Sequence, residues 1–135
     1  MSAAKLLLSY FFTLACFLVI DMLWLGVVAK GLYQKHLHGW MAPQVNWWAA
    51  GIFYLLFIAG IMAFVVMPAL EKNSWQRAVG YGAFFGLITY ATYDLTNLAT
   101  LRNWPATLVW IDMIWGAVLT ALVSTAGFFI TKTIQ

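Results

Sequence analysis

Residues Leu6–Ala29 read LLLSYFFTLACFLVIDMLWLGVVA, an apolar run that contains one charged residue, Asp21. A helix of roughly 20 apolar residues crosses the hydrocarbon layer of a bilayer, which is about 30 Å thick. This run is therefore long enough for one crossing. Three more runs of similar length follow it, Trp47–Leu70, Ala78–Leu101 and Ala106–Ile130.

The composition of the whole chain agrees with membrane insertion. Of the 135 residues, 64% are hydrophobic and 8% are charged, whereas soluble domains have roughly 45–50% apolar and about 25% charged residues. This excludes a soluble enzyme domain, a disordered chain and a nucleic-acid-binding protein. The seven basic residues are scattered and form no patch for a polyanion. We expect the lipid bilayer, and no nucleic acid, as a partner.

Short connections separate the four runs, at Lys30–Asn46, Glu71–Arg77 and Arg102–Pro105. Each contains residues typical of turns, and short connections make consecutive helices antiparallel neighbours. A membrane barrel would need strands of alternating polarity, which the sequence lacks. We therefore predict an all-α fold, a four-helix transmembrane bundle that forms one integral membrane domain over residues 1–135.

Basic residues flank the spans on both sides. The side that holds the two termini would carry Lys5, Lys72, Arg77 and Lys132, and the other side Lys30, Lys35 and Arg102. Because cytoplasmic loops carry the excess of Lys and Arg, we predict a multi-pass protein of the cell inner (plasma) membrane with both termini in the cytoplasm.

Three carboxylates, Asp21, Asp94 and Asp112, fall inside the predicted spans. Each costs roughly 2.5–3.5 kcal/mol near the centre of a membrane helix on insertion scales. Counted at about 1.5 Å per residue from the nearest end of its span, each lies roughly 9–12 Å below the same interface. We therefore expect the three side chains to meet in one polar cup.

The sequence around these carboxylates suggests how the helices pack. Small and hydroxyl residues share a helix face with each one: Ser9 and Thr13 with Asp21, Gly82 and Gly86 with Asp94, Gly116, Thr120 and Ser124 with Asp112. Such residues let membrane helices approach closely and form hydrogen bonds. The bundle should be tight at the end of Ser9, Gly82 and Ser124 and open at the aspartate end.

A five-residue pattern occurs twice, as Ile20–Trp24 (IDMLW) and Ile111–Trp115 (IDMIW), on helices expected to run in opposite directions. A Trp three residues after an Asp lies on the same helix face, so we predict that each indole N–H serves the Asp of its own motif. Asn97 has the same spacing from Asp94. Tyr90 and Tyr93 would line the cup beside them.

A purely structural interpretation competes with this one. Buried aspartates can act only as interhelical hydrogen-bonding groups, and Lys30 or Arg102 could reach down to neutralise one of them. No cofactor and no metal are predicted: the spans contain no His, and His36 and His38 lie in a connection without a neighbouring carboxylate. Cys16 and Ser124 lack a His partner for nucleophilic catalysis.

The stretch Tyr93–Pro105, the segment Asp112–Gly116 and the segment Asp21–Gly26 together resemble a family of small bacterial predicted membrane proteins that is classed as a domain of unknown function. The resemblance covers essentially the whole chain. It implies a bacterial multi-pass membrane protein with four helices, and it supplies no catalytic residues.

The residues therefore predict a carboxylate-lined, aromatic-walled pocket that binds or passes a small molecule, a lipid or a proton. The candidate ligand-binding residues are Asp21, Asp94, Asp112, Asn97, Trp24, Trp115, Tyr90 and Tyr93. Because four helices rarely enclose a complete pathway, a transporting unit would be a homo-oligomer. Two other hypotheses stay open. One is a small membrane enzyme that uses Asp94 with Asp21 or Asp112 for acid–base chemistry on a lipid-soluble substrate, and the other is an accessory subunit that recognises a partner's membrane helix.

Overall fold

The computed structural model describes residues 1–135, and the fold is entirely helical. The helices are α1 (Ala3–Leu23), α2 (Lys30–Leu37), α3 (Trp47–Ile61), α4 (Met67–Glu71), α5 (Trp75–Thr100) and α6 (Ala106–Ile134). Two π-helical segments, η1 (Trp24–Val28) and η2 (Met62–Val66), continue α1 and α3. The connection predicted at residues 30–46 is thus not wholly irregular, because it contains α2.

Side-chain caps fix where three of the long helices begin. Ser2 Oγ accepts a hydrogen bond from the Lys5 N–H at 3.2 Å, and Asn46 Oδ1 accepts one from the Ala49 N–H at 3.1 Å. Ser74 Oγ does the same for the Arg77 N–H at 3.3 Å. These bonds satisfy backbone donors that a helix start otherwise leaves without a partner.

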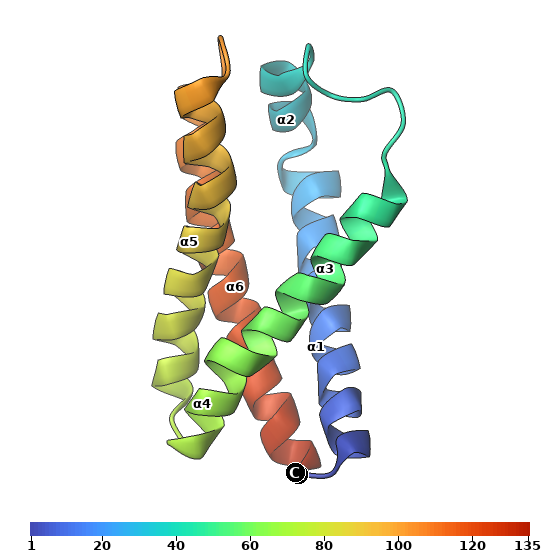
Figure 1. The fold of residues 1–135 in the computed structure, drawn as a ribbon, viewed down its shortest axis with the longest axis vertical. Coiled ribbons are helices and arrows are strands. Elements are labelled where there is room, and N and C mark those ends of the chain that lie inside the picture. Colours follow the sequence, from blue (N-terminus) through green and yellow to red (C-terminus); the bar gives the residue numbers. More distant parts are fainter.

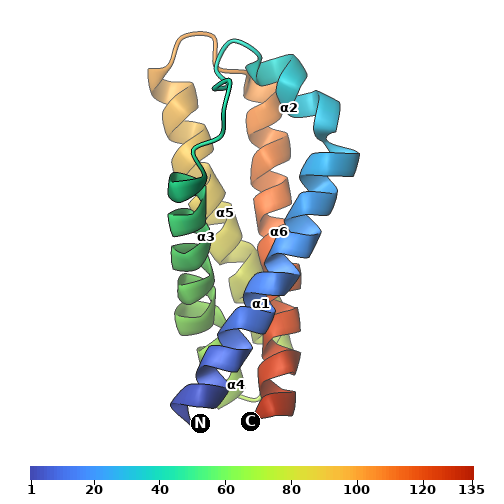
Figure 2. The same cartoon turned by 90° about the vertical axis from the view of Figure 1, so that its right-hand side faces the viewer.

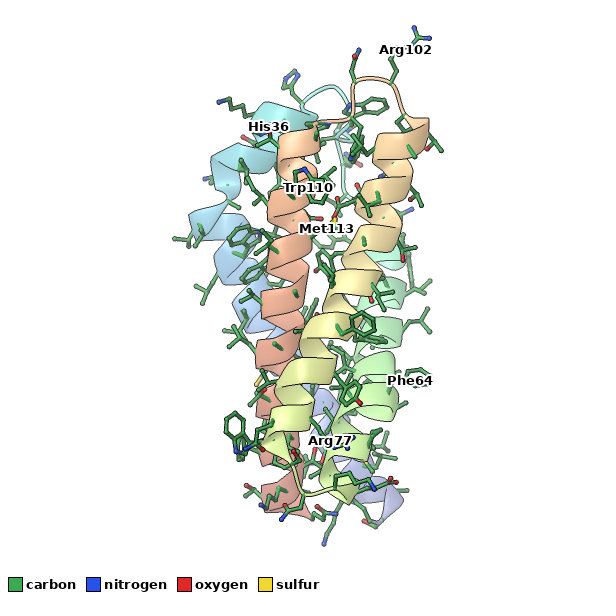
Figure 3. All side chains as sticks on the ribbon, turned by 90° about the vertical axis from the view of Figure 1, so that its left-hand side faces the viewer. His36, Phe64, Arg77, Arg102, Trp110 and Met113 are labelled. Atoms are coloured by element: carbon green, nitrogen blue, oxygen red, sulfur yellow. The ribbon has the colours of Figure 1, made fainter.

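The long helices lie side by side and alternate in direction (Figure 1). Helix α6 is central: it packs against α5 along most of its length and against α1 on another side. It has more buried residues than any other helix. Both termini lie at one end of the molecule, whereas α2 lies at the other (Figure 2). Arg77 and Arg102 likewise mark opposite ends (Figure 3).

Three helical segments are long and apolar enough to cross a membrane: Ala3–Val28, Trp47–Glu71 and Ala106–Ile134. Large apolar side chains cover their outer surfaces, for example Leu7, Leu56 and Phe129, all of which are exposed. Helix α5 has 26 residues but is not among these three segments. The three apolar helices define a multi-pass membrane protein.

Glycines let α5 and α6 approach closely. A Cβ atom added to Gly82 would lie 2.8 Å from Ser124 Oγ, and one added to Gly86 would lie 2.6 Å from Thr120 Cβ. On the other side of α6, a Cβ on Gly127 would lie 3.0 Å from Thr13 Oγ1 of α1. These approaches confirm the tight packing expected at the end of the bundle that holds Ser9, Gly82 and Ser124.

Apolar side chains fill the interior between α1, α3, η2 and α6. This core consists of Phe17, Phe57, Ile58, Ile61, Met62, Val66, Leu119 and Val123. Phe17 lies one helical turn before Asp21, so the core ends where the carboxylates begin. The packed core therefore forms a floor beneath the candidate site.

Candidate functional site

A cavity of about 590 Å³ lies between α1, α2, α3, α5 and α6, above this core. Its lining is Asp21, Trp24, Leu25, Tyr33, Ala50, Phe53, Tyr54, Thr89, Tyr90, Tyr93, Asp112 and Trp115. Six of the eight residues predicted as ligand-binding from the sequence are in this set. Tyr33, together with Ala50, Phe53 and Tyr54 of α3, was not predicted to be part of the site.

Asp21 and Asp112 lie on different helices, α1 and α6, and both are buried, with 6% and 8% of their surfaces exposed. The indole N–H of Trp115 donates to Asp21 Oδ1 at 3.4 Å. The hydroxyl of Tyr33 donates to Asp112 Oδ1 at 2.7 Å, a short bond of the kind a charged acceptor forms. Each carboxyl group thus has one donor.

The donors are exchanged between the two IDM-[LI]-W motifs, so the prediction that each Trp serves its own Asp is wrong. Trp115 of α6 donates to Asp21 of α1. Trp24 of η1, the segment that continues α1, donates at 3.0 Å to the hydroxyl of Tyr33, which in turn donates to Asp112 of α6. The physical reason is that the two helices are antiparallel neighbours, so that each indole reaches across to the facing helix more readily than back along its own.

The two indoles also contact each other directly. The rings of Trp24 and Trp115 are stacked, with centroids 4.4 Å apart and an angle of 8° between their planes. Aromatic pairs of this kind contribute about 0.5–1.5 kcal/mol beyond the area that they bury. The stack joins α1 to α6 and holds both N–H groups in position.

Tyr33 comes from α2, the short helix inside the connection between the first two spans. It accepts from one indole and donates to Asp112, so its hydroxyl links two helices. Burial, followed by the hydrogen bond to Asp112, raises the pKa of Tyr33 above its ordinary value. The hydroxyl therefore remains a hydrogen-bond donor throughout the physiological pH range.

Asp94 and Asn97, both predicted as site residues, do not line the cavity. Asp94 is the most buried of the three carboxylates, with 2% of its surface exposed, and Asp112 is its neighbouring acidic group. Its Oδ2 atom has no hydrogen-bond partner, so the amide of Asn97 does not serve as the donor expected from its spacing. Asp94 therefore lies outside the cavity lining, although Tyr90, one helical turn earlier, belongs to it.

Helix α3 closes the cavity with Ala50, Phe53 and Tyr54. This helix has no ionisable residue within the span, and Tyr54 is its main polar side chain. The ring of Phe53 stacks on Phe57 of the core, and the ring of Tyr54 packs at a tilt against Phe17. The spacing Ala50–Tyr54 places both residues on one helix face, which is the signal that could have assigned them to the site.

No basic side chain lines the cavity. Lys30 and Arg102, the two residues considered as neutralising groups, are both exposed, and Arg102 lies in the loop at the far end of α5 (Figure 3). No group of three His, Cys, Asp or Glu side chains is placed to hold a metal ion. The negative character of Asp21 and Asp112 therefore has no cationic partner within the chain.

The three apolar helices describe a multi-pass membrane protein. Comparison with known families agrees with the membrane assignment. The chain belongs to a family of predicted membrane proteins, DUF2177, which matches residues 6–129. No curated protein and no solved structure matches the chain.

Proposed function

We propose that this protein is a small-molecule-binding membrane protein whose ligand occupies the cavity between Asp21 and Asp112. The observation that carries the proposal is the cavity itself, at about 590 Å³. Ligand pockets usually measure about 300–1,000 Å³ and combine apolar walls with a few polar groups. Here the polar groups are two carboxyls held by fixed donors on rigid helices, which is how binding sites are preorganised.

We further propose that α5 is a fourth membrane span. Its 26 residues extend over roughly 39 Å at 1.5 Å per residue, which exceeds the hydrocarbon thickness of about 30 Å. It packs closely on the apolar helix α6 through Gly82 and Gly86. Its polar residues Asp94 and Tyr90 are turned toward the interior, where membrane proteins keep such groups.

Thiol labelling from one side of the membrane tests the fourth span. Cysteines are introduced singly at Ser74 and Asn103, the residues beyond the two ends of α5, in a Cys16→Ser background that has no other thiol. We expect the two positions to react with an impermeant maleimide from opposite sides of sealed vesicles. Labelling of both from the same side would contradict the crossing.

Filling the cavity tests the binding function. Ala50 lines the cavity, whereas its neighbour Ala49 is exposed on the outer surface of α3, so Ala50→Phe and Ala49→Phe form a matched pair. We expect a small molecule to co-purify with the wild-type protein and with Ala49→Phe, as detected by native mass spectrometry, and to be lost from Ala50→Phe. Equal occupancy in the two variants would refute a ligand site in this cavity.

A second candidate function is acid–base catalysis on a lipid-soluble substrate. It is favoured by the fact that two carboxyl groups on opposite helices face one cavity, since general acid and base residues must both reach the substrate. Asp21 and Asp112 would be the pair, because Asp94 does not reach the cavity. The test is whether cells that lack the protein, or that carry Asp112→Asn, accumulate a lipid that wild-type cells convert; an unchanged lipid composition would contradict it.

A further inference from the structure

We propose that the ligand of this cavity is an organic cation, an amine or quaternary ammonium compound with an apolar body. This inference rests on the proposed binding function and specifies the ligand's chemistry. Three features of the cavity support it: the balance of charge, the hydrogen-bonding state of the wall, and the aromatic surface.

The balance of charge favours a positive ligand. Asp21 and Asp112 line the cavity and are more than nine-tenths buried, and no Lys, Arg or His is among the lining residues. Asp21 accepts a single hydrogen bond, through Oδ1, and its Oδ2 has no partner in the protein. Acidic side chains within membranes are costly unless they are paired, and a bound cation would supply the missing partner.

The hydrogen bonds around the two carboxylates disfavour an anionic ligand there. The indole N–H of Trp24, the indole N–H of Trp115 and the hydroxyl of Tyr33 are already used within the wall. Thr89 Oγ1 donates to the carbonyl oxygen of Phe85 on its own helix at 2.8 Å. Next to the carboxylates, a phosphate or a carboxylate would therefore meet acceptors where it needs donors, whereas an ammonium group needs no donor from the protein. The lining's free donors are the hydroxyls of Tyr54, Tyr90 and Tyr93.

The remaining wall is suited to the body of such a cation. Seven of the twelve lining residues are aromatic: Trp24, Tyr33, Phe53, Tyr54, Tyr90, Tyr93 and Trp115. Aromatic faces attract cations through the ring quadrupole, and Trp and Tyr walls are typical of sites that bind quaternary ammonium groups. Carboxylates supply the charge and aromatic rings supply apolar contact, so both parts of the ligand have a complementary surface.

The test compares two probes that differ by one atom. Benzyltrimethylammonium is the cation, and 2,2-dimethylpropylbenzene, in which carbon replaces the nitrogen, is its neutral counterpart of the same shape. Binding is measured by calorimetry on the protein in phosphatidylcholine nanodiscs, after subtraction of the signal from empty nanodiscs. We expect the cation to bind at least about tenfold more tightly than the neutral probe, as a charge pair in a partly desolvated site requires.

Variants assign that preference to the carboxylates. Asp21→Asn and Asp112→Asn should each weaken cation binding by about tenfold or more, and should leave binding of the neutral probe within about twofold. Glu71→Gln is the matched control, because Glu71 is the chain's fourth acidic residue and is exposed at the end of α4. If an aspartate variant does not fold, the comparison of the two probes on the wild-type protein still decides the question.

The possible failures can be distinguished. If the neutral probe binds as tightly as the cation and Ala50→Phe abolishes both, the cavity is a binding site but its ligand is not selected by charge, and the inference is wrong. If neither probe binds and nothing co-purifies with the protein, the inference and the proposed binding function both fail. A cation preference that survives in the Asp21→Asn, Asp112→Asn double variant would overturn the inference as well.

Discussion

Gly86 offers the sharpest test of how the site is held together. In Gly86→Ala, the new Cβ would lie 2.6 Å from Thr120 Cβ of α6, and still closer to the Gly116 carbonyl oxygen. Ordinary van der Waals contact begins near 3.4 Å, so α5 and α6 must separate locally by about 0.8 Å or more, in a bundle interior that has few voids to absorb the change. A Cβ added to Gly80, on the same helix, would meet nothing within 4 Å, so Gly80→Ala is the matched control.

The expected difference in the free energy of unfolding between the two variants follows from the surroundings of Gly86 and Gly80. Overpacking of a tightly packed interior usually costs about 1–3 kcal/mol, whereas replacing Gly by Ala in an open helix position gains up to about 1 kcal/mol in helix propensity. Because both glycines lie in α5, the gain in helix propensity is common to both variants. We therefore expect Gly86→Ala to be less stable than Gly80→Ala by the overpacking cost, about 1–3 kcal/mol. Because α5 and α6 both line the cavity above this contact, the same change should also weaken ligand binding.

The assay is unfolding in mixed micelles by titration with sodium dodecyl sulfate, followed by far-UV circular dichroism and tryptophan fluorescence. Gly86→Ala should unfold at a lower detergent fraction than wild type, and Gly80→Ala at the same or a higher one. Equal midpoints for the two variants would refute the close approach of α5 and α6 at this level and, with it, the placement of Asp94 against Asp112.

Three further predictions concern individual contacts and use the same unfolding assay. Tyr33→Phe removes the bond to Asp112 and the acceptor of Trp24, and should cost about 1–3 kcal/mol; an unchanged midpoint would contradict the link between α2 and α6. Trp115→Phe loses the long bond to Asp21 and part of the ring that stacks on Trp24, so it should also be destabilising; an unchanged midpoint would contradict these contacts. Gly82→Ala should be destabilising and should be partly rescued by Ser124→Gly, because the new methyl group meets the Ser124 side chain; additive losses in the double variant would argue against this contact.

Much of the helical fold could be predicted from the sequence, because apolar runs of membrane length leave few alternatives. The runs around Asp21 and Asp112 coincide with apolar helices in the structure, and the turn residues near Asn73 and Asn103 coincide with left-handed backbone, at φ 48° and 62°. The span proposed for α5 has a weaker signal in the sequence, since α5 carries Tyr, Thr, Asp and Asn residues that lower its hydropathy. Its packing on α6 can be recognised only once the two helices are seen together.

The candidate site was harder to predict, because helical spacing specifies the face of a side chain but not its partner. Counting along each helix placed Asp21 and Asp112 at one depth, and the structure has both at one cavity. The same counting assigned Trp115 to the wrong carboxylate, since it considered only neighbours within a helix. Tyr33 was missed because the short helix that carries it has mixed polarity and lies in a segment that reads as a connection.

The exchange of donors between the two motifs has a consequence for how the sequence can change over time. A substitution of Trp115 on α6 would remove the hydrogen-bond donor of Asp21 on α1. A substitution of Trp24 would affect Asp112 only through Tyr33. The hydrogen bonds thus couple three segments that are distant in the chain, so that a substitution in one affects the others. Across the family, we expect these positions to vary jointly or not at all, so that a substitution in one motif is accompanied by compensation in the other.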